Sequence, residues 1–78
     1  MPHIVVKLWP GQSIDEKQRL CDAIVAGVSQ ILGHGEASVS VGFEEIAASD
    51  WTAAVYEPDI AAKWSTLLKQ PGYGSGPA

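Results

Sequence analysis

The chain has few of the features that stabilise very small proteins. Its 78 residues include a single cysteine, Cys21, so no disulfide can form within the chain. A domain of this size buries only about 60% of the surface that its unfolded form exposes. Association with a second copy is therefore the common remaining route to stability.

Positive charge is scarce and scattered. The sequence has five basic residues against nine acidic ones, which gives a formal net charge of −4 at pH 7. The basic residues form no cluster, so the pattern of a nucleic-acid-binding protein is missing. No apolar run approaches the roughly 20 residues that cross a bilayer, and no secretory signal pattern is found. We expect a cytoplasmic protein that binds neither nucleic acid nor a membrane.

Two segments have the composition of β-strands. Residues 3–9 are rich in β-branched and apolar side chains and end at a Pro-Gly turn signal. Residues 38–44 alternate in polarity, with Val39, Val41 and Phe43 on one face. We therefore expect a strand in each segment.

A long helix is predicted between the two strands, over residues 15–32. Ser13 and Glu16 have the spacing of a capping box, and Gly33 fits the end of a helix. Strand, helix and strand in this order form a βαβ unit, whose two strands run parallel. The predicted fold class is α/β (α+β), a βαβ protomer.

The last third of the sequence is less regular. Residues 46–56 fit either a short strand or a loop that packs on a partner. Pro58 is suited to the first turn of a second helix, which Pro71-Gly72 would end. The apolar stripe of this extra C-terminal helix would consist of Ile60, Trp64, Leu67 and Leu68.

The predicted protomer is incomplete by itself. Two strands under one helical layer do not make a stable sheet, and the second face of residues 3–9 carries Val5 and Trp9. A symmetric homodimer would join two protomers into a four-stranded sheet. We expect residues 1–72 to form a single domain and residues 73–78 to form a flexible tail.

Pro2 directly follows Met1. Removal of Met1, which is common before a small residue, would make the nitrogen of Pro2 a secondary amine. An α-amino group titrates near 8, and burial moves its pKa toward neutrality, the range that a general base needs. With Met1 retained, this nitrogen is an amide and cannot be a base. On position alone, the simpler interpretation is that Pro2 begins a strand.

Several features together resemble the 4-oxalocrotonate tautomerase family, and the likeness covers about the first two thirds of the chain. They are Pro2 behind Met1, a short strand ending in Pro10-Gly11, the helix of residues 13–32 and the strand that begins Ser38-Val39-Ser40-Val41. The last third, with Trp51 and the ending Lys69-Gln70-Pro71-Gly72-Tyr73, is similar to the dimeric PptA-like branch of that family.

The resemblance implies an isomerase, a keto-enol tautomerase that transfers protons without a cofactor. It implies that Pro2 is the catalytic base and acid, and that Trp51 is an apolar wall of the pocket. An ordinary packed aromatic is an equally good interpretation of Trp51. Ser38 matches a family serine near the substrate, and Trp9 is suited to a wall contributed by a neighbouring subunit.

The sequence departs from the family at two positions. The family's two arginines fall at Gln12 and Ser40, and neutral donors cannot make the charge-assisted contacts that dicarboxylates require. The resemblance therefore implies that Gln12 and Ser40 contact an enol or α-keto mono-acid with an aromatic, phenylpyruvate-like tail. The same departures motivate an alternative, a non-catalytic dimeric binding or assembly module. The two histidines lack metal-ligand spacing, so no metal site is expected.

Overall fold

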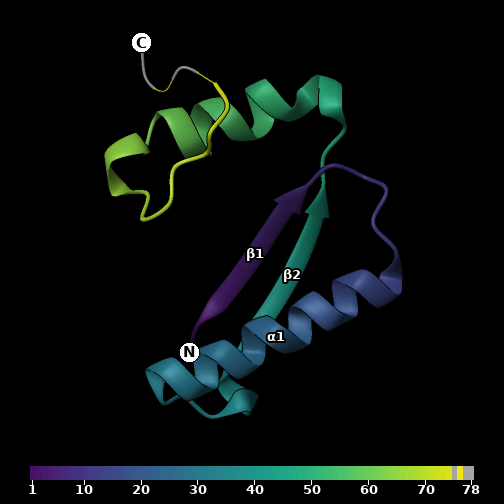
Figure 1. Cartoon of the computed structure of the whole chain (residues 1–78), viewed down its shortest axis with the longest axis vertical. Helices are drawn as coiled ribbons and strands as arrows, with labels where there is room; N and C mark the ends of the chain where they lie inside the picture. Colours follow the sequence, from purple (N-terminus) through teal and green to yellow (C-terminus); the bar gives the residue numbers. More distant parts are fainter. Residues whose placement is uncertain (75, 77–78) are drawn as a thin grey trace. The chain divides into compact units, whose positions relative to one another are not determined.

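The computed structural model describes residues 1–74 and 76, and the chain divides into two compact units. The first unit is Met1–Glu45, and the second begins at Ile46. Figure 1 shows the elements in chain order: β1 (His3–Leu8), α1 (Ile14–Leu32), a 3₁₀ turn (Glu36–Ser38), β2 (Ser40–Glu45), a 3₁₀ turn (Ala48–Asp50), a π-helix (Thr52–Ala61) and a 3₁₀ turn (Trp64–Thr66).

The first unit is a βαβ structure, as the sequence predicts. β1 and β2 pair in parallel, in a register that runs from His3 opposite Ser40 to Leu8 opposite Glu45. The second strand begins two residues later than expected. The reason is local, because the 3₁₀ turn before it uses the N–H of Val39 to bond the carbonyl of Glu36 at 3.1 Å.

The ends of α1 are fixed by the capping residues that the sequence predicts. The Ser13 hydroxyl accepts from the N–H of Glu16 at 3.0 Å, and the Glu16 carboxylate accepts from the N–H of Ser13 at 2.9 Å. These two bonds satisfy backbone donors that the first helical turn leaves open. At the other end, Gly33 takes a left-handed conformation with φ 74°, which glycine adopts without steric cost.

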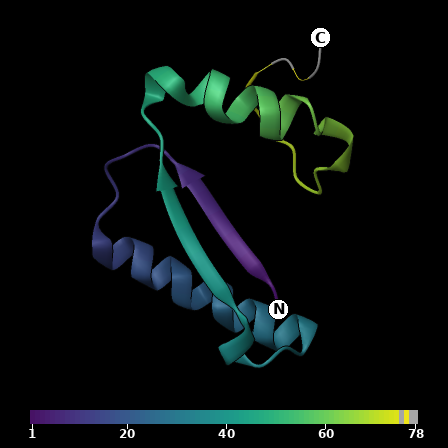
Figure 2. The same cartoon turned by 180° about the vertical axis from the view of Figure 1, so that it is seen from behind.

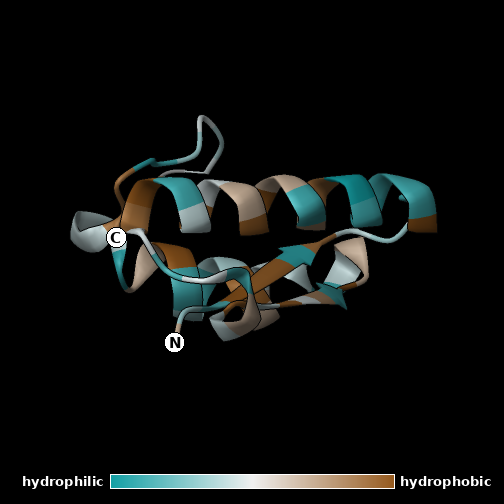
Figure 3. Ribbon diagram, turned by 90° about the horizontal axis from the view of Figure 1, so that it is seen from below, coloured by the Kyte–Doolittle hydropathy of each residue, from teal (hydrophilic) through white to brown (hydrophobic). Residues whose placement is uncertain are grey.

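α1 lies across one face of the two strands (Figure 3). Ile4, Val6 and Leu8 alternate along β1 and are half-buried. The ion pair between Lys17 of α1 and Glu45 of β2, at 2.8 Å, ties the helix to the sheet. Val5 on the opposite face is 41% exposed, so the first unit covers only one face of its own sheet.

The second unit differs from the sequence prediction. Its helix spans Thr52–Ala61, and Pro58 lies inside it rather than in its first turn. The expectation of a strand or loop over residues 46–56 is therefore wrong from Thr52 onward, and so are the predicted bounds of the second helix. The N–H of Ala62 bonds the carbonyl of Glu57 at 3.0 Å, the five-residue spacing of a π-helix.

The second half of the predicted helix also differs from the prediction. Trp64 begins a separate 3₁₀ turn, and Leu68 is fully exposed beyond it. Among the described residues, Val55 is the one apolar residue that is buried, with 4% of its surface exposed. An interior this small is consistent with a protomer that needs further burial.

The C-terminal segment contacts the π-helix. The rings of Tyr56 and Tyr73 lie 5.9 Å apart, and the N–H of Gly76 donates to the Tyr56 hydroxyl at 2.8 Å. The flexible tail predicted for residues 73–78 includes residues 75, 77 and 78, which lie outside the described residues.

None of the helices within residues 1–74 combines the length and the apolar character that crossing a membrane requires.

Candidate functional site

Pro2 precedes β1 at the start of the sheet. It is half-buried, while Met1 before it is 97% exposed. The carbonyl of Pro2 accepts a hydrogen bond from the N–H of Ser40 at 3.1 Å. Pro2 is therefore anchored to the neighbouring strand through its carbonyl. The side chain of Met1, which precedes it, is exposed.

Ser40 and His3 meet beside Pro2. They are direct neighbours in the strand register, and Nδ1 of His3 lies 2.6 Å from Oγ of Ser40. Because side chains alternate along a strand, both lie on the face opposite Ile4, which is the face away from α1. The sequence pointed to Ser40 through the family resemblance, but it did not reveal this pair, because no local pattern gives the register of two strands 37 residues apart.

Ser38 belongs to the turn that leads into β2. Its hydroxyl donates to the carbonyl of Gly35 at 2.7 Å. Because Ser38 lies two residues before the start of β2, it belongs to the same end of the sheet as Pro2. Its hydroxyl stabilises the turn and keeps a free lone pair for a further contact.

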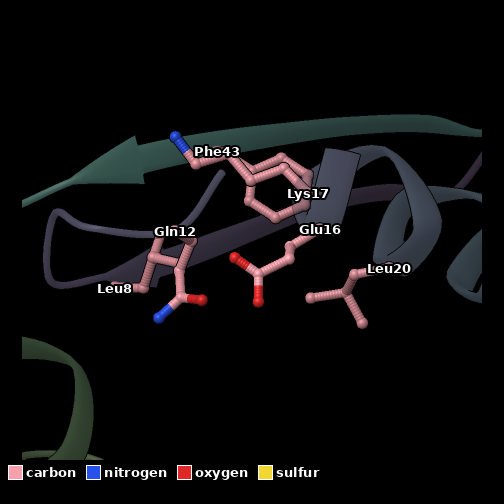
Figure 4. Close-up of a pocket in the computed structure, with 6 residues that line it drawn as sticks. All are labelled: Leu8, Gln12, Glu16, Lys17, Leu20 and Phe43. Carbon is pink, nitrogen blue, oxygen red and sulfur yellow. The ribbon is translucent and has the colours of Figure 1, made fainter. Parts of the chain in front are cut away.

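Gln12 lies in a pocket at the other end of the sheet (Figure 4). The pocket has a volume of about 160 Å³, less than the roughly 300 Å³ at which ligand pockets begin. Its lining comes from the end of β1, the start of α1 and β2: Leu8, Gln12, Glu16, Lys17, Leu20 and Phe43. The hollow within one chain is therefore too small to hold a typical ligand by itself.

The charged side chains of this pocket have partners within the chain: Glu16 is hydrogen-bonded to Ser13, and Lys17 forms an ion pair with Glu45. The hydrogen bond from the backbone N–H of Ser13, followed by the bond with its side chain, lowers the pKa of Glu16 below its ordinary value. The amine of Lys17 lies 2.8 Å from the carboxylate of Glu45. The pocket therefore offers an anionic carboxylate and a neutral amide, and its one cation is shared with Glu45.

The predicted site residues of the first unit fall into two groups. Figure 2 shows the N-terminus at one end of β1 and the loop to α1 at the other. Pro2 lies at the first end, whereas Trp9 and Gln12 lie in the loop at the second. Six residues of strand span about 20 Å, so one chain does not bring Pro2 and Gln12 onto the same small molecule. Trp9 is 57% exposed.

Trp51 belongs to the second unit. Its indole N–H donates to the hydroxyl of Tyr73 at 3.2 Å, so the interpretation of a packed aromatic accounts for its polar atom. Sequence reasoning gave no role to Tyr73. An aromatic residue close behind Pro71-Gly72, where the chain turns back, was the available signal.

No group of three or more His, Cys, Asp or Glu residues capable of holding a metal occurs among residues 1–74 and 76.

Comparison with known proteins places the chain in a family. No family model matches it, but individual relatives do. It is 45% identical over 74 residues to a protein of Xylella fastidiosa named "Probable tautomerase", covering 95% of this chain and 90% of that protein. It is 36% identical to the tautomerase PptA of Cronobacter sakazakii, covering 94% of this chain and 97% of that one.

The chain belongs to the 4-oxalocrotonate tautomerase family. A crystal structure of YwhB, a homologue of 4-oxalocrotonate tautomerase, matches with a TM-score of 0.57 and 26% identity, over 59% of this chain and 75% of that one. These relatives support a tautomerase activity for this family member, and so an isomerase. The βαβ fold predicted from the sequence is confirmed.

Proposed function

We propose that this tautomerase converts an aromatic, phenylpyruvate-like enol mono-acid into its α-keto form without a cofactor, with the amine of Pro2 as general base and acid. The observation that carries the proposal is the similarity to named tautomerases over 94–95% of the chain, with Pro2 directly behind Met1. The reaction requires that Met1 be removed, because only then does the nitrogen of Pro2 have a lone pair for a proton.

The reaction needs one base that also returns the proton. The Pro2 nitrogen takes the proton of the enol hydroxyl, so that the O–H bond breaks and a carbonyl forms at C2. The same nitrogen then gives a proton to C3, where a new C–H bond forms. One proton moves from oxygen to carbon, and nothing is oxidised or reduced. Burial of such an amine would favour its neutral, proton-accepting form.

The chemistry of the surrounding residues supports a mono-acid with an apolar tail. Gln12 and Ser40 stand where the family has arginines, and neither brings a positive charge. The carboxylate of Glu16 beside Gln12 would repel a second carboxylate of the substrate. The apolar walls that we assign to the substrate's ring are Trp9 and Phe43, both of the first unit.

The complete site requires a homodimer in this proposal. A two-fold axis pairs a strand with its own copy in antiparallel direction, so the start of β1 in one chain meets the end of β1 in the other. Pro2 would then lie beside Trp9 and Gln12 of the partner subunit. Pairing through β2 would not bring these residues together. The two-stranded sheet, which is marginally stable by itself, favours such a partner.

The first test measures the role of Pro2. Intact-mass spectrometry first establishes that Met1 is absent. Ketonisation of phenylenolpyruvate is then followed by ultraviolet absorbance for wild type and Pro2→Ala. We expect kcat/KM to fall by about 10²- to 10⁴-fold, the usual contribution of a general acid-base group. Equal rates for the two proteins, or a retained Met1 in an active enzyme, would rule out Pro2 as the base.

The second test asks whether two chains share one site. Pro2→Ala and Gln12→Ala chains are each inactive or weak alone, and they are mixed after partial unfolding so that heterodimers form. One of the two sites in a heterodimer then has both native residues. About half of the chains become heterodimeric, so about a quarter of wild-type activity should return. If both residues came from the same chain, mixing would restore no complete site and the activity would stay low.

The alternative of a non-catalytic dimeric module is motivated by the same neutral positions, Gln12 and Ser40. It predicts a stable dimer with no ketonisation above that of Pro2→Ala. The Pro2 experiment therefore separates the two functions directly.

A further inference from the structure

We propose that His3 and Ser40 form a positioning pair that holds Pro2 in its catalytic orientation, and that Ser40 acts by this route rather than by contact with substrate. This inference rests on the proposed role of Pro2. It assigns a role to His3, and it gives Ser40 a role other than the one that its family position implies.

A terminal proline has one soft backbone torsion left. The ring fixes φ, and removal of Met1 frees the nitrogen, so the direction of the amine relative to the sheet depends on ψ of Pro2. That torsion is set by where the carbonyl of Pro2 points. The N–H of Ser40 holds this carbonyl at 3.1 Å, and this bond is the contact that fixes the amine's direction.

The bond lies at the open end of a two-stranded sheet. The register begins with His3 opposite Ser40, and end positions of a sheet open more easily than central ones. The contact of 2.6 Å between Nδ1 of His3 and Oγ of Ser40 joins the two strands at this first position. The side-chain bond therefore keeps the strands together where the backbone bond to Pro2 is made.

The same contact leaves Ser40 poorly suited to hold a substrate carboxylate. Its hydroxyl is engaged by the imidazole on the face of the sheet away from α1. A hydroxyl that binds a carboxylate donates its one proton, and the imidazole competes for that proton when Nδ1 carries none. The pair is thus complete within one chain, before any substrate binds.

Two variants of His3 distinguish loss of the contact with Ser40 from the general effect of replacing the histidine. His3→Asn places an amide near the position of Nδ1 and keeps a partner for Ser40. His3→Gln places its amide near the position of Nε2 and removes that partner. Ser40→Ala removes the bond from the other side. Gln18→Ala is the matched control, because it removes an exposed side-chain hydrogen bond to Asp22, of 2.9 Å, within α1.

The decisive measurement is amide hydrogen exchange of Ser40 by NMR, because it reports the bond to Pro2 without any turnover. We expect exchange to be about 3- to 10-fold faster in His3→Gln, the range that one hydrogen bond supports, and unchanged in His3→Asn and Gln18→Ala. Unchanged exchange in His3→Gln would overturn the proposal, even if the enzyme proves to be an active tautomerase. If the enzyme has no activity, the exchange result still decides whether the pair holds Pro2.

Kinetics then distinguish positioning from substrate contact. His3→Gln and Ser40→Ala should each lower kcat by about 3- to 10-fold with little change in KM, and the double variant should lower it no further, because both changes break one interaction. A raised KM in Ser40→Ala together with a wild-type kcat in His3→Gln would instead make Ser40 a substrate contact and overturn the proposal.

Discussion

The two units of this small tautomerase are built in different ways. In Met1–Glu45, neighbouring residues in the sequence define each element: a β-branched strand, a capped helix and a second strand. In the unit that begins at Ile46, aromatic side chains far apart in the sequence contact one another. Trp51 bonds Tyr73 across 22 positions, and Tyr56 bonds Gly76 across 20.

This difference explains where the helices begin. The start of α1 follows from a local capping box, since Ser13 and Glu16 satisfy each other. The π-helix has no side-chain cap at its start, and it contains Pro58, which usually interrupts a helix. At this helix, contacts of Trp51 and Tyr56 with the C-terminal segment take the place of capping residues. The second unit should therefore be the more sensitive of the two to changes outside its helix.

The largest effect on stability is expected at Gly74. It has φ 77°, and a Cβ at this position would overlap the Tyr56 side chain. Gly74→Ala should lower the free energy of unfolding by about 2 kcal/mol and should shift the indole N–H resonance of Trp51, because the segment carrying Tyr73 would move. Urea unfolding at fixed protein concentration and ¹⁵N NMR measure the two effects.

Gly72→Ala is the control for this change. A Cβ there meets no atom within 4 Å, and the backbone does not have positive φ. We expect its stability to stay within about 0.5 kcal/mol of wild type. Similar losses in the two variants would mean that the C-terminal contacts do not hold the second unit together.

A smaller effect is expected at the start of α1. Ser13→Ala should lower the free energy of unfolding by about 1 kcal/mol, the usual cost of a lost cap. Ser13→Thr keeps the hydroxyl and should lose less. An effect in Ser13→Ala as large as that in Gly74→Ala would contradict the view that the second unit is the more sensitive one.

This change should also depend on pH. The bonds with Ser13 lower the pKa of Glu16 in the folded chain, so the ionised carboxylate favours folding. Its contribution is complete above the ordinary pKa of a glutamate and is lost as pH falls through the lowered value. The difference between wild type and Ser13→Ala should therefore shrink in acid. The pKa of Glu16 in the variant, followed by NMR titration, should rise but stay below its ordinary value, because the larger bond, from the backbone N–H of residue 13, remains.

In the candidate site, too, some features depend on neighbouring residues in the sequence and others on contacts between distant segments. The sequence pointed to Pro2 because its position behind Met1 is a local fact. The strand predicted over residues 3–9 also implies that Pro2 and Gln12 lie at opposite ends of β1, because one precedes the strand and the other follows it. The sequence could not show the pair of His3 and Ser40, which the parallel register creates.

The amino-acid sequence by itself determined the βαβ order, the capping box, the glycine end of α1 and the scarcity of positive charge. These features depend on residues within a few positions of one another or on composition. Only the tertiary structure decided the register, the course of the chain after Ile46 and the partners of Trp51, Ser40 and Lys17. These depend on which distant segments meet, and such contacts are selected by packing of the whole chain rather than by any local preference.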